Sequence, residues 1–299
     1  MSNELHDILE SDDVQKIATG FVFTEGPLWH PDGFWYFVDI RQNKLFRLVP
    51  GQTPELVRTT LGGNGTTFDL EGRLINCEGD GRRLTRQAPD GSVDVIADSY
   101  DGRRFARPND VICHSNGCLY FTDPDKRVAY HKREIPGPDG IDGLWDGACV
   151  YRLTPRGKLS VLVHCEYPNG LALSLDERRL YVANTRSSKY IHAIDLDGDG
   201  LMTARGIFAD MNAGDAPGIP DGLKVDSLGR VYCTGPGGIW VFTPEGDHLG
   251  TIGWPEQAVN FAFGGADLRT LLCCAHTSLY TMRVKAPGNP HPWYRLHAT

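Results

Sequence analysis

The sequence predicts an all-β fold, a six-bladed β-propeller formed by a single domain over residues 1–299. Three observations predict it. A turn followed by an alternating apolar strand recurs six times along the chain. The chain has 35 glycines and 19 prolines among its 299 residues, a larger share than the about 12% that these two residue types usually supply together. No long segment has the 3.6-residue period of an amphipathic helix.

The six recurring units share a turn and a strand of period two. They read PDGFWYFVDI, LEGRLINCEG, SNGCLYFTDP, LDERRLYVAN, SLGRVYCTGP and ADLRTLLCCA. Their second turn residues, used here as anchors, are Gly33, Gly72, Gly117, Glu177, Gly229 and Leu268. Successive anchors are 39, 45, 60, 52 and 39 residues apart, and further short strands lie between them. Units of this length that hold several strands are typical of propeller blades around a central channel.

The ends of the chain and one long interval complete the predicted architecture. Residues 14–23 contain a strand before the first unit, and we expect it to complete the last blade and close the ring. This leaves a short N-terminal extension, residues 1–13. The longest interval predicts an insertion in blade three at about residues 125–147. We expect it to form a lid that sets substrate choice; the alternative is an exposed loop without a role.

Composition excludes several classes of function. The formal net charge is −8, so no basic face is available for nucleic acid. No apolar run reaches the 18 residues of a membrane span, so no membrane partner is expected. No secretory signal is visible, and the eight cysteines are scattered, often inside apolar runs. Buried thiols and a cytoplasmic location are therefore expected. The oligomeric state is left open.

An acid or an amide lies eight residues before every anchor. These six register residues are Glu25, Asn64, Asn109, Asn169, Asp221 and Asn260. The innermost strand of each blade lines the channel, so residues just before it point at one centre. Asn-Gly and Asp-Gly pairs are also ordinary turn residues, which is the alternative interpretation. Glu25 is a poor turn residue, and its place in the register favours a convergent polar site.

Two carboxylates among these oxygen-bearing side chains predict a cation. Glu25 and Asp221 would repel each other in one cavity unless they were protonated or bridged by positive charge. Oxygen ligands without histidine or cysteine select a hard divalent cation, calcium first and magnesium or manganese next. A buried network of neutral amides is the alternative, but it leaves the two carboxylates unexplained.

Several segments in fixed order also carry a family resemblance. They are TEGPLWHPDGFWYFVDI, NGTTFDLEGRLINCEGDGRRLTR, RPNDVICHSNGCLYFTDP, YPNGLALSLDERRLYVANT and IPDGLKVDSLGRVYCTG. From about residue 17 to 285 the chain resembles the gluconolactonase family related to senescence marker protein 30 (SMP-30). The resemblance implies a six-bladed propeller with one divalent cation in the central channel and a small-molecule sugar lactone as substrate. Calcium is the first choice, and zinc, manganese or magnesium are the alternatives.

The resemblance also implies site residues. The metal ligands match Glu25 in TEGP, Asn169 in YPNG and Asp221 in IPDG. The substrate-contacting residues match Arg107 and Asn109 in RPND, and in some relatives this Asn also touches the metal.

The sequence departs from the family pattern at the rim. Gly79 stands where relatives often have histidine. Asp125, Lys126 and Arg127 follow FTDP where relatives often read PYG. We therefore expect an intact metal site and an altered substrate rim, which leaves the particular lactone open.

Metal-polarised attack of water on the lactone carbonyl is the expected reaction. A divalent cation makes the carbonyl more electrophilic and stabilises the oxyanion. Asp221 is the candidate catalytic base that takes a proton from the attacking water. Glu25 and Asn169 are then chiefly ligands. The sequence lacks a G-x-S-x-G nucleophile elbow. The alternatives are a phosphotriester or fluorophosphate hydrolase on the same propeller, or a calcium-binding propeller without catalysis.

Overall fold

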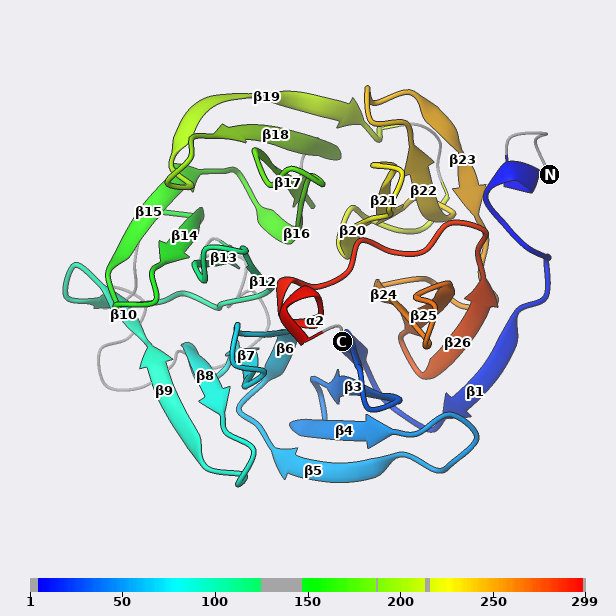
Figure 1. Ribbon diagram of the computed structural model, residues 1–299, viewed down its shortest axis with the longest axis horizontal. Helices are drawn as coiled ribbons and strands as arrows, with labels where there is room; N and C mark the ends of the chain where they lie inside the picture. The colour runs from blue at the N-terminus through cyan, green and yellow to red at the C-terminus, as the bar shows by residue number, and fades with distance from the viewer. Residues whose placement is uncertain (1–4, 125–146, 187, 213–215, 298–299) are drawn as a thin grey trace.

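The computed structural model describes residues 5–124, 147–186, 188–212 and 216–297. Within these residues, six antiparallel four-stranded sheets surround a central axis, as predicted (Figure 1). Neighbouring blades are held together by clusters of buried apolar side chains. Seven of the eight cysteines are buried, and Cys165 is partly buried. No helix in the described segments is long and apolar enough to cross a membrane.

The blades follow one another along the chain, each from its inner to its outer strand. Blade one contains β2 (Thr24–His30), β3 (Phe34–Asp39), β4 (Lys44–Leu48) and β5 (Glu55–Thr59). Blade two contains β6 (Gly63–Phe68), β7 (Leu74–Glu78), β8 (Arg83–Gln87) and β9 (Val93–Ala97). A two-stranded hairpin follows, made of β10 (Ser99–Tyr100) and β11 (Arg103–Arg104). Blade three contains β12 (Val111–Cys113), β13 (Leu119–Asp123), β14 (Cys149–Leu153) and β15 (Leu159–His164).

The second half of the ring repeats this order. Blade four contains β16 (Pro168–Leu173), β17 (Arg179–Asn184), β18 (Tyr190–Leu196) and β19 (Met202–Asp210). Blade five contains β20 (Leu223–Val225), β21 (Val231–Gly235), β22 (Gly238–Phe242) and β23 (His248–Ile252). Blade six contains β24 (Asn260–Gly264), β25 (Thr270–Ala275), β26 (Ser278–Arg283) and, as its outer strand, β1 (Gln15–Thr19).

The ring closes through the N-terminal strand, as predicted. β1 pairs antiparallel with β26, and Gln15 lies opposite Thr281. The short helical turn η1 (Leu5–Asp7) precedes this strand, and Leu5, Ile8 and Leu9 are buried in an apolar cluster with blades five and six. Part of the predicted extension is therefore packed against the propeller, which the sequence did not predict.

All six anchor residues adopt the left-handed backbone conformation. Their φ angles are 90° at Gly33, 75° at Gly72, 81° at Gly117, 56° at Glu177, 78° at Gly229 and 54° at Leu268. This conformation is uncommon for residues other than glycine, so its recurrence at Glu177 and Leu268 confirms that the six turns are structurally equivalent.

Glycines after the register residues serve close packing of neighbouring inner strands. Four register residues lie inside the first strands of their blades, and the other two lie just before β12 and β20. A Cβ atom at Gly170 would collide with the backbone carbonyl of Asp221 in the next blade. A Cβ atom at Gly26 would meet the carbonyl of Asn64 in the same way. The interpretation of these Asn-Gly and Asp-Gly pairs as ordinary turn residues is therefore wrong. Their glycines allow the inner strands of adjacent blades to approach each other around the channel.

The C-terminal segment covers one end of the channel. The helix α2 (Pro292–His297) lies over the centre of the ring (Figure 1). The Tyr294 hydroxyl donates a hydrogen bond to the Trp29 carbonyl of blade one. The last repeat was expected to end near residue 285, and the sequence did not predict this cover. The predicted insertion and lid at about 125–147 fall on residues 125–146, outside the described residues.

Candidate active site

A cavity of about 670 Å³ occupies the channel at the N-terminal ends of the inner strands. Five of the six register residues line it: Glu25, Asn64, Asn109, Asn169 and Asp221. Arg107 lines it as well, so every residue predicted to bind metal or substrate lies in one cavity.

Glu25 is almost fully buried near the start of β2. Its Oε2 atom accepts hydrogen bonds from the Gly26 amide at 2.6 Å and from the Asn260 side chain at 2.8 Å. Burial raises the pKa of Glu25 to about 7, and the nearby charge of Asp110 adds to the rise. Asn260, the sixth register residue, thus lies behind Glu25 and orients its carboxylate.

Asp221 enters the cavity from blade five, just before β20. Its backbone amide donates to the Thr234 hydroxyl at 3.1 Å, which fixes the chain where the side chain emerges. Burial raises the pKa of Asp221 well above its usual value, and the charges of Glu25 and Asp110 raise it further. The two carboxylates therefore interact unfavourably when both are ionised, and the positive charge of Lys224 opposes this only in part.

Two amide oxygens in the same cavity lack a partner. The Asn169 side-chain nitrogen donates to the Thr185 hydroxyl at 2.9 Å, and that hydroxyl donates to the Pro220 carbonyl at 2.6 Å. This chain of hydrogen bonds leaves Oδ1 of Asn169 buried and without a donor among the described residues, and Oδ1 of Asn64 is in the same state. An unsatisfied buried polar group costs about 1–3 kcal/mol.

The oxygen atoms that line this cavity fit a divalent cation. Two carboxylates and two unpaired amide oxygens are ligands that hard cations such as calcium prefer. Among the described residues, no three His, Cys, Asp or Glu side chains gather as a metal site, so a cation held here would need the amide oxygens as well. A cation would satisfy the orphaned oxygens of Asn64 and Asn169 and reduce the repulsion between Glu25 and Asp221.

Arg107 is held at the rim of the cavity by its own ion pair. Its Nη2 atom lies 3.1 Å from Oδ1 of Asp80, and its backbone amide donates to Asp123 at 2.6 Å. A Cβ atom at Gly79 would lie 2.8 Å from Cγ of Arg107. The glycine at position 79 therefore makes room for the Arg107 side chain. The other altered rim residues, Asp125, Lys126 and Arg127, lie outside the described residues.

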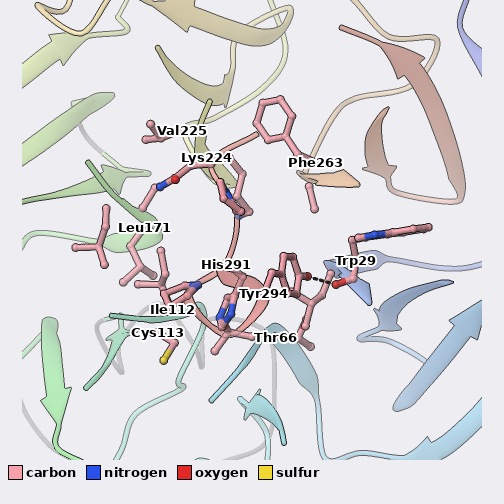
Figure 2. Close-up of a pocket in the computed structure, with 18 of the residues that line it drawn as sticks. Trp29, Thr66, Ile112, Cys113, Leu171, Lys224, Val225, Phe263, His291 and Tyr294 are labelled. Atoms are coloured by element: carbon pink, nitrogen blue, oxygen red, sulfur yellow. Dashed lines mark hydrogen bonds between the residues drawn. The ribbon is translucent and has the colours of Figure 1, made fainter. Parts of the chain in front are cut away.

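The opposite end of the channel is a separate cavity beneath α2 (Figure 2). Residues further along the same inner strands, such as Thr66, Leu171 and Lys224, line it together with His291. Burial lowers the pKa of His291 to about 3, so the imidazole is neutral, and its Nε2 atom lies 3.2 Å from the Thr67 hydroxyl. None of the six register residues lines this end.

The comparison with protein families identifies the chain. The family model described as the SMP-30/Gluconolactonase/LRE-like region matches residues 23–277, which is most of the sequence. The chain belongs to this family. The predicted family resemblance and the six-bladed fold are thereby confirmed.

Individual members of the SMP-30/gluconolactonase family resemble the chain over most of its length. A gluconolactonase of Zymomonas mobilis is 30% identical over 92% of this chain and 82% of its own. A pentonolactonase of Haloferax volcanii is 30% identical over 83% of this chain and 79% of its own. The solved structure of a Xanthomonas campestris gluconolactonase matches with a TM-score of 0.85 and 28% identity, covering 95% of this chain and 94% of that one.

Some features of the site were missed by sequence reasoning. Asn64 was placed in the register but not among the predicted ligands, although its oxygen is orphaned. Asp110 is buried beside the channel. The sequence could have pointed to it as a site residue, because four other repeats have glycine at the equivalent position. Thr185 and the cavity-lining Arg41 and Arg186 follow second strands of their blades, and nothing in the sequence marks them.

Proposed function

We propose that this protein is a divalent-metal-dependent hydrolase that opens a sugar lactone in the cavity lined by Glu25 and Asp221. The observation that carries the proposal is a pair of buried oxygens, of Asn64 and Asn169, that have no hydrogen-bond partner among the described residues and lie beside two mutually repelling carboxylates. The substrate class rests on relatives named gluconolactonase and pentonolactonase at 30% identity over most of the chain.

In this proposal Glu25, Asn169 and Asp221 hold the cation, and Asn64 supplies a further oxygen. Calcium suits such a set of oxygen ligands best, with zinc, manganese or magnesium as alternatives. When bound, the cation would polarise the lactone carbonyl and stabilise negative charge on its oxygen. Asn260 keeps the carboxylate of Glu25 turned toward the site, and Thr185 does the same for the amide of Asn169.

The remaining steps belong to the protein's own side chains. The carboxylate of Asp221 accepts a proton from the attacking water, whose oxygen forms a bond to the acyl carbon. The bond from that carbon to the ring oxygen then breaks, and the ring oxygen receives the proton that Asp221 took from the water, so that the product is a hydroxy acid. Arg107, fixed by Asp80, and Asn109 hydrogen-bond sugar hydroxyls or the ring oxygen at the rim.

The proposed function is tested with a panel of substrates. Purified protein supplemented in turn with calcium, zinc, manganese and magnesium is assayed in a pH-stat against aldonolactones of five- and six-membered rings. A phosphotriester serves as the competing substrate class. Metal-dependent acid release from at least one lactone supports the proposal. Turnover of the phosphotriester alone, or of no substrate, contradicts it.

We expect Arg107→Ala to lower kcat/KM for the preferred lactone by about 10- to 100-fold, because a charged hydrogen-bond donor to the substrate is lost. Metal affinity should change by less than about twofold, since the guanidinium pairs with Asp80 and not with the predicted ligands. Initial rates and isothermal titration with the metal alone measure the two quantities. Arg156→Ala, in an exposed turn, is the matched control. Loss of metal binding with unchanged substrate constants would refute this division of roles.

We expect Thr185→Val to weaken metal binding by about 10-fold or more, because it removes the hydroxyl that orients the Asn169 amide. Thr185→Ser retains the hydroxyl and should restore most of the affinity. Calorimetric titration of the metal-free variants with calcium measures the effect. Equal affinities for the valine and serine variants would show that Thr185 does not position Asn169.

A further inference from the structure

Two arginines stand at the mouth of the cavity on opposite sides of the channel. Arg41 follows β3 of blade one, and Arg186 follows β17 of blade four. These two blades face each other across the ring (Figure 1). Both arginines line the same cavity as Glu25 and Asp221, and both are exposed to solvent at its rim.

Each of these guanidinium groups lies over an aromatic ring. The Cζ atom of Arg41 is 5.9 Å from the centroid of Phe23, and that of Arg186 is 5.2 Å from the centroid of Tyr167. Both rings also line the cavity. Contact with a ring restricts a guanidinium, and most of its five N–H donors, which point outward in its own plane, remain available for a ligand.

Neither guanidinium is neutralised by the described part of the protein. No carboxylate of the described residues lies within ion-pair distance of Arg41 or Arg186. Arg107 on the same rim differs, because Asp80 pairs with it. The whole chain has a net charge of −8, so among the described residues Arg41 and Arg186 place two positive charges at the mouth of this cavity on an acidic protein. Deeper in the same cavity lie the carboxylates of Glu25 and Asp221, whose charge the predicted cation would offset. Positive charge at the mouth of such a cavity attracts anionic ligands.

Of the two arginines, Arg186 is connected more directly to residues of the predicted cation site. It directly follows Thr185, whose hydroxyl accepts the hydrogen bond from Asn169. Tyr167, whose ring its guanidinium lies over, is two residues before Asn169. The Arg186 carbonyl accepts hydrogen bonds from the Asn184 side chain at 3.0 Å and from the Ser188 amide at 2.7 Å. A substituent of a lactone bound at the predicted site could therefore reach this guanidinium.

We propose that the lactone substrate is an anion, a sugar lactone that carries a carboxylate or a phosphate group, and that Arg186 binds this group. Arg41 adds positive potential from the opposite side of the mouth. The inference rests on the proposed function and specifies its substrate class. The chemistry is unchanged: water adds across the acyl C–O bond, the anionic substituent is not altered, and the product carries one further carboxylate.

Matched lactone pairs test this inference. Glucono-1,4-lactone and glucaro-1,4-lactone differ by a carboxylate in place of a hydroxymethyl group. Glucono-1,5-lactone and its 6-phosphate differ by a phosphate. We expect kcat/KM to be at least about 10-fold higher for the anionic member of one pair, and the responding pair distinguishes carboxylate from phosphate. The preference should shrink when salt is raised from about 0.01 M to about 0.3 M, because ions screen the attraction.

Variants then assign the preference to the arginines. Arg186→Gln should reduce the ratio of anionic to neutral kcat/KM by about 10-fold, and Arg41→Gln should reduce it less. Arg156→Gln, an exposed arginine in the turn between β14 and β15, should leave the ratio unchanged. Equal rates for both members of each pair, or an unchanged ratio in Arg186→Gln, would overturn the inference while lactone hydrolysis stands. Absence of turnover for all four lactones would contradict the proposed function itself, and the inference with it.

Discussion

Asp221→Ala is expected to lower kcat for lactone hydrolysis by about 10³-fold or more, the largest effect of any single substitution in the site. The change removes both a predicted ligand and the predicted base. The fold should persist, because the backbone amide of residue 221 still donates to Thr234 and the blades are held by strand packing. Steady-state kinetics, calorimetric metal titration and thermal unfolding measure the three quantities.

Two further variants separate the roles of Asp221. Asp221→Asn keeps an oxygen that can face a cation but cannot accept the proton, so it should retain more metal affinity than the alanine variant while remaining inactive. Asp199→Ala, in the exposed hairpin between β18 and β19, is the control for loss of an aspartate. Near-normal turnover in Asp221→Asn would exclude Asp221 as the base.

Gly170→Ala is expected to lower the free energy of unfolding by about 1–3 kcal/mol, the largest stability effect that we predict. The added Cβ would collide with the carbonyl of Asp221 and would lie 2.8 Å from its carbonyl carbon. Relief of this collision must move β16 away from blade five, so metal affinity should fall as well. Urea denaturation measures the stability.

Gly206→Ala is the matched control for this substitution. Gly206 is also a strand glycine, in β19, but a Cβ atom there meets nothing within 4 Å. Its effect on stability should stay within about 0.5 kcal/mol. Equal stability of the two alanine variants would show that the glycines after the register residues do not serve the close approach of inner strands.

The fold was largely predictable because it repeats. A turn that needs a left-handed residue recurs in every blade, and glycine marks it in four of six. Glu177 and Leu268 adopt the same conformation without that marker, and only the shared register revealed them. Counting eight residues back from each turn then placed Glu25, Asn169 and Asp221 in one cavity, because equivalent positions of the inner strands all face the axis.

Features that depend on single tertiary contacts could not be predicted. The cover formed by α2 rests on contacts such as that of Tyr294 with Trp29, which belong to no repeat. Asn260 occupies the same register position as the other five residues, yet its side-chain amide donates a hydrogen bond to Glu25 and does not line the cavity. The contact of the Arg186 guanidinium with the Tyr167 ring joins the residues that follow β17 to the residues that precede β16, and the sequence does not specify it. The repeat thus determines where backbones lie, and side-chain partners decide what each position does.

The side-chain oxygens of Glu25, Asn169 and Asp221 are predicted to hold a cation that lactone hydrolysis requires. Removing the metal and adding it back is the most direct test of this prediction. The protein is stripped with a chelator, dialysed, and titrated with calcium by calorimetry while hydrolysis of the preferred lactone is followed in parallel. We predict that turnover falls to the uncatalysed rate in the stripped protein and returns as one equivalent of cation binds. Full turnover by the stripped protein, or saturable metal binding that does not restore turnover, would contradict this.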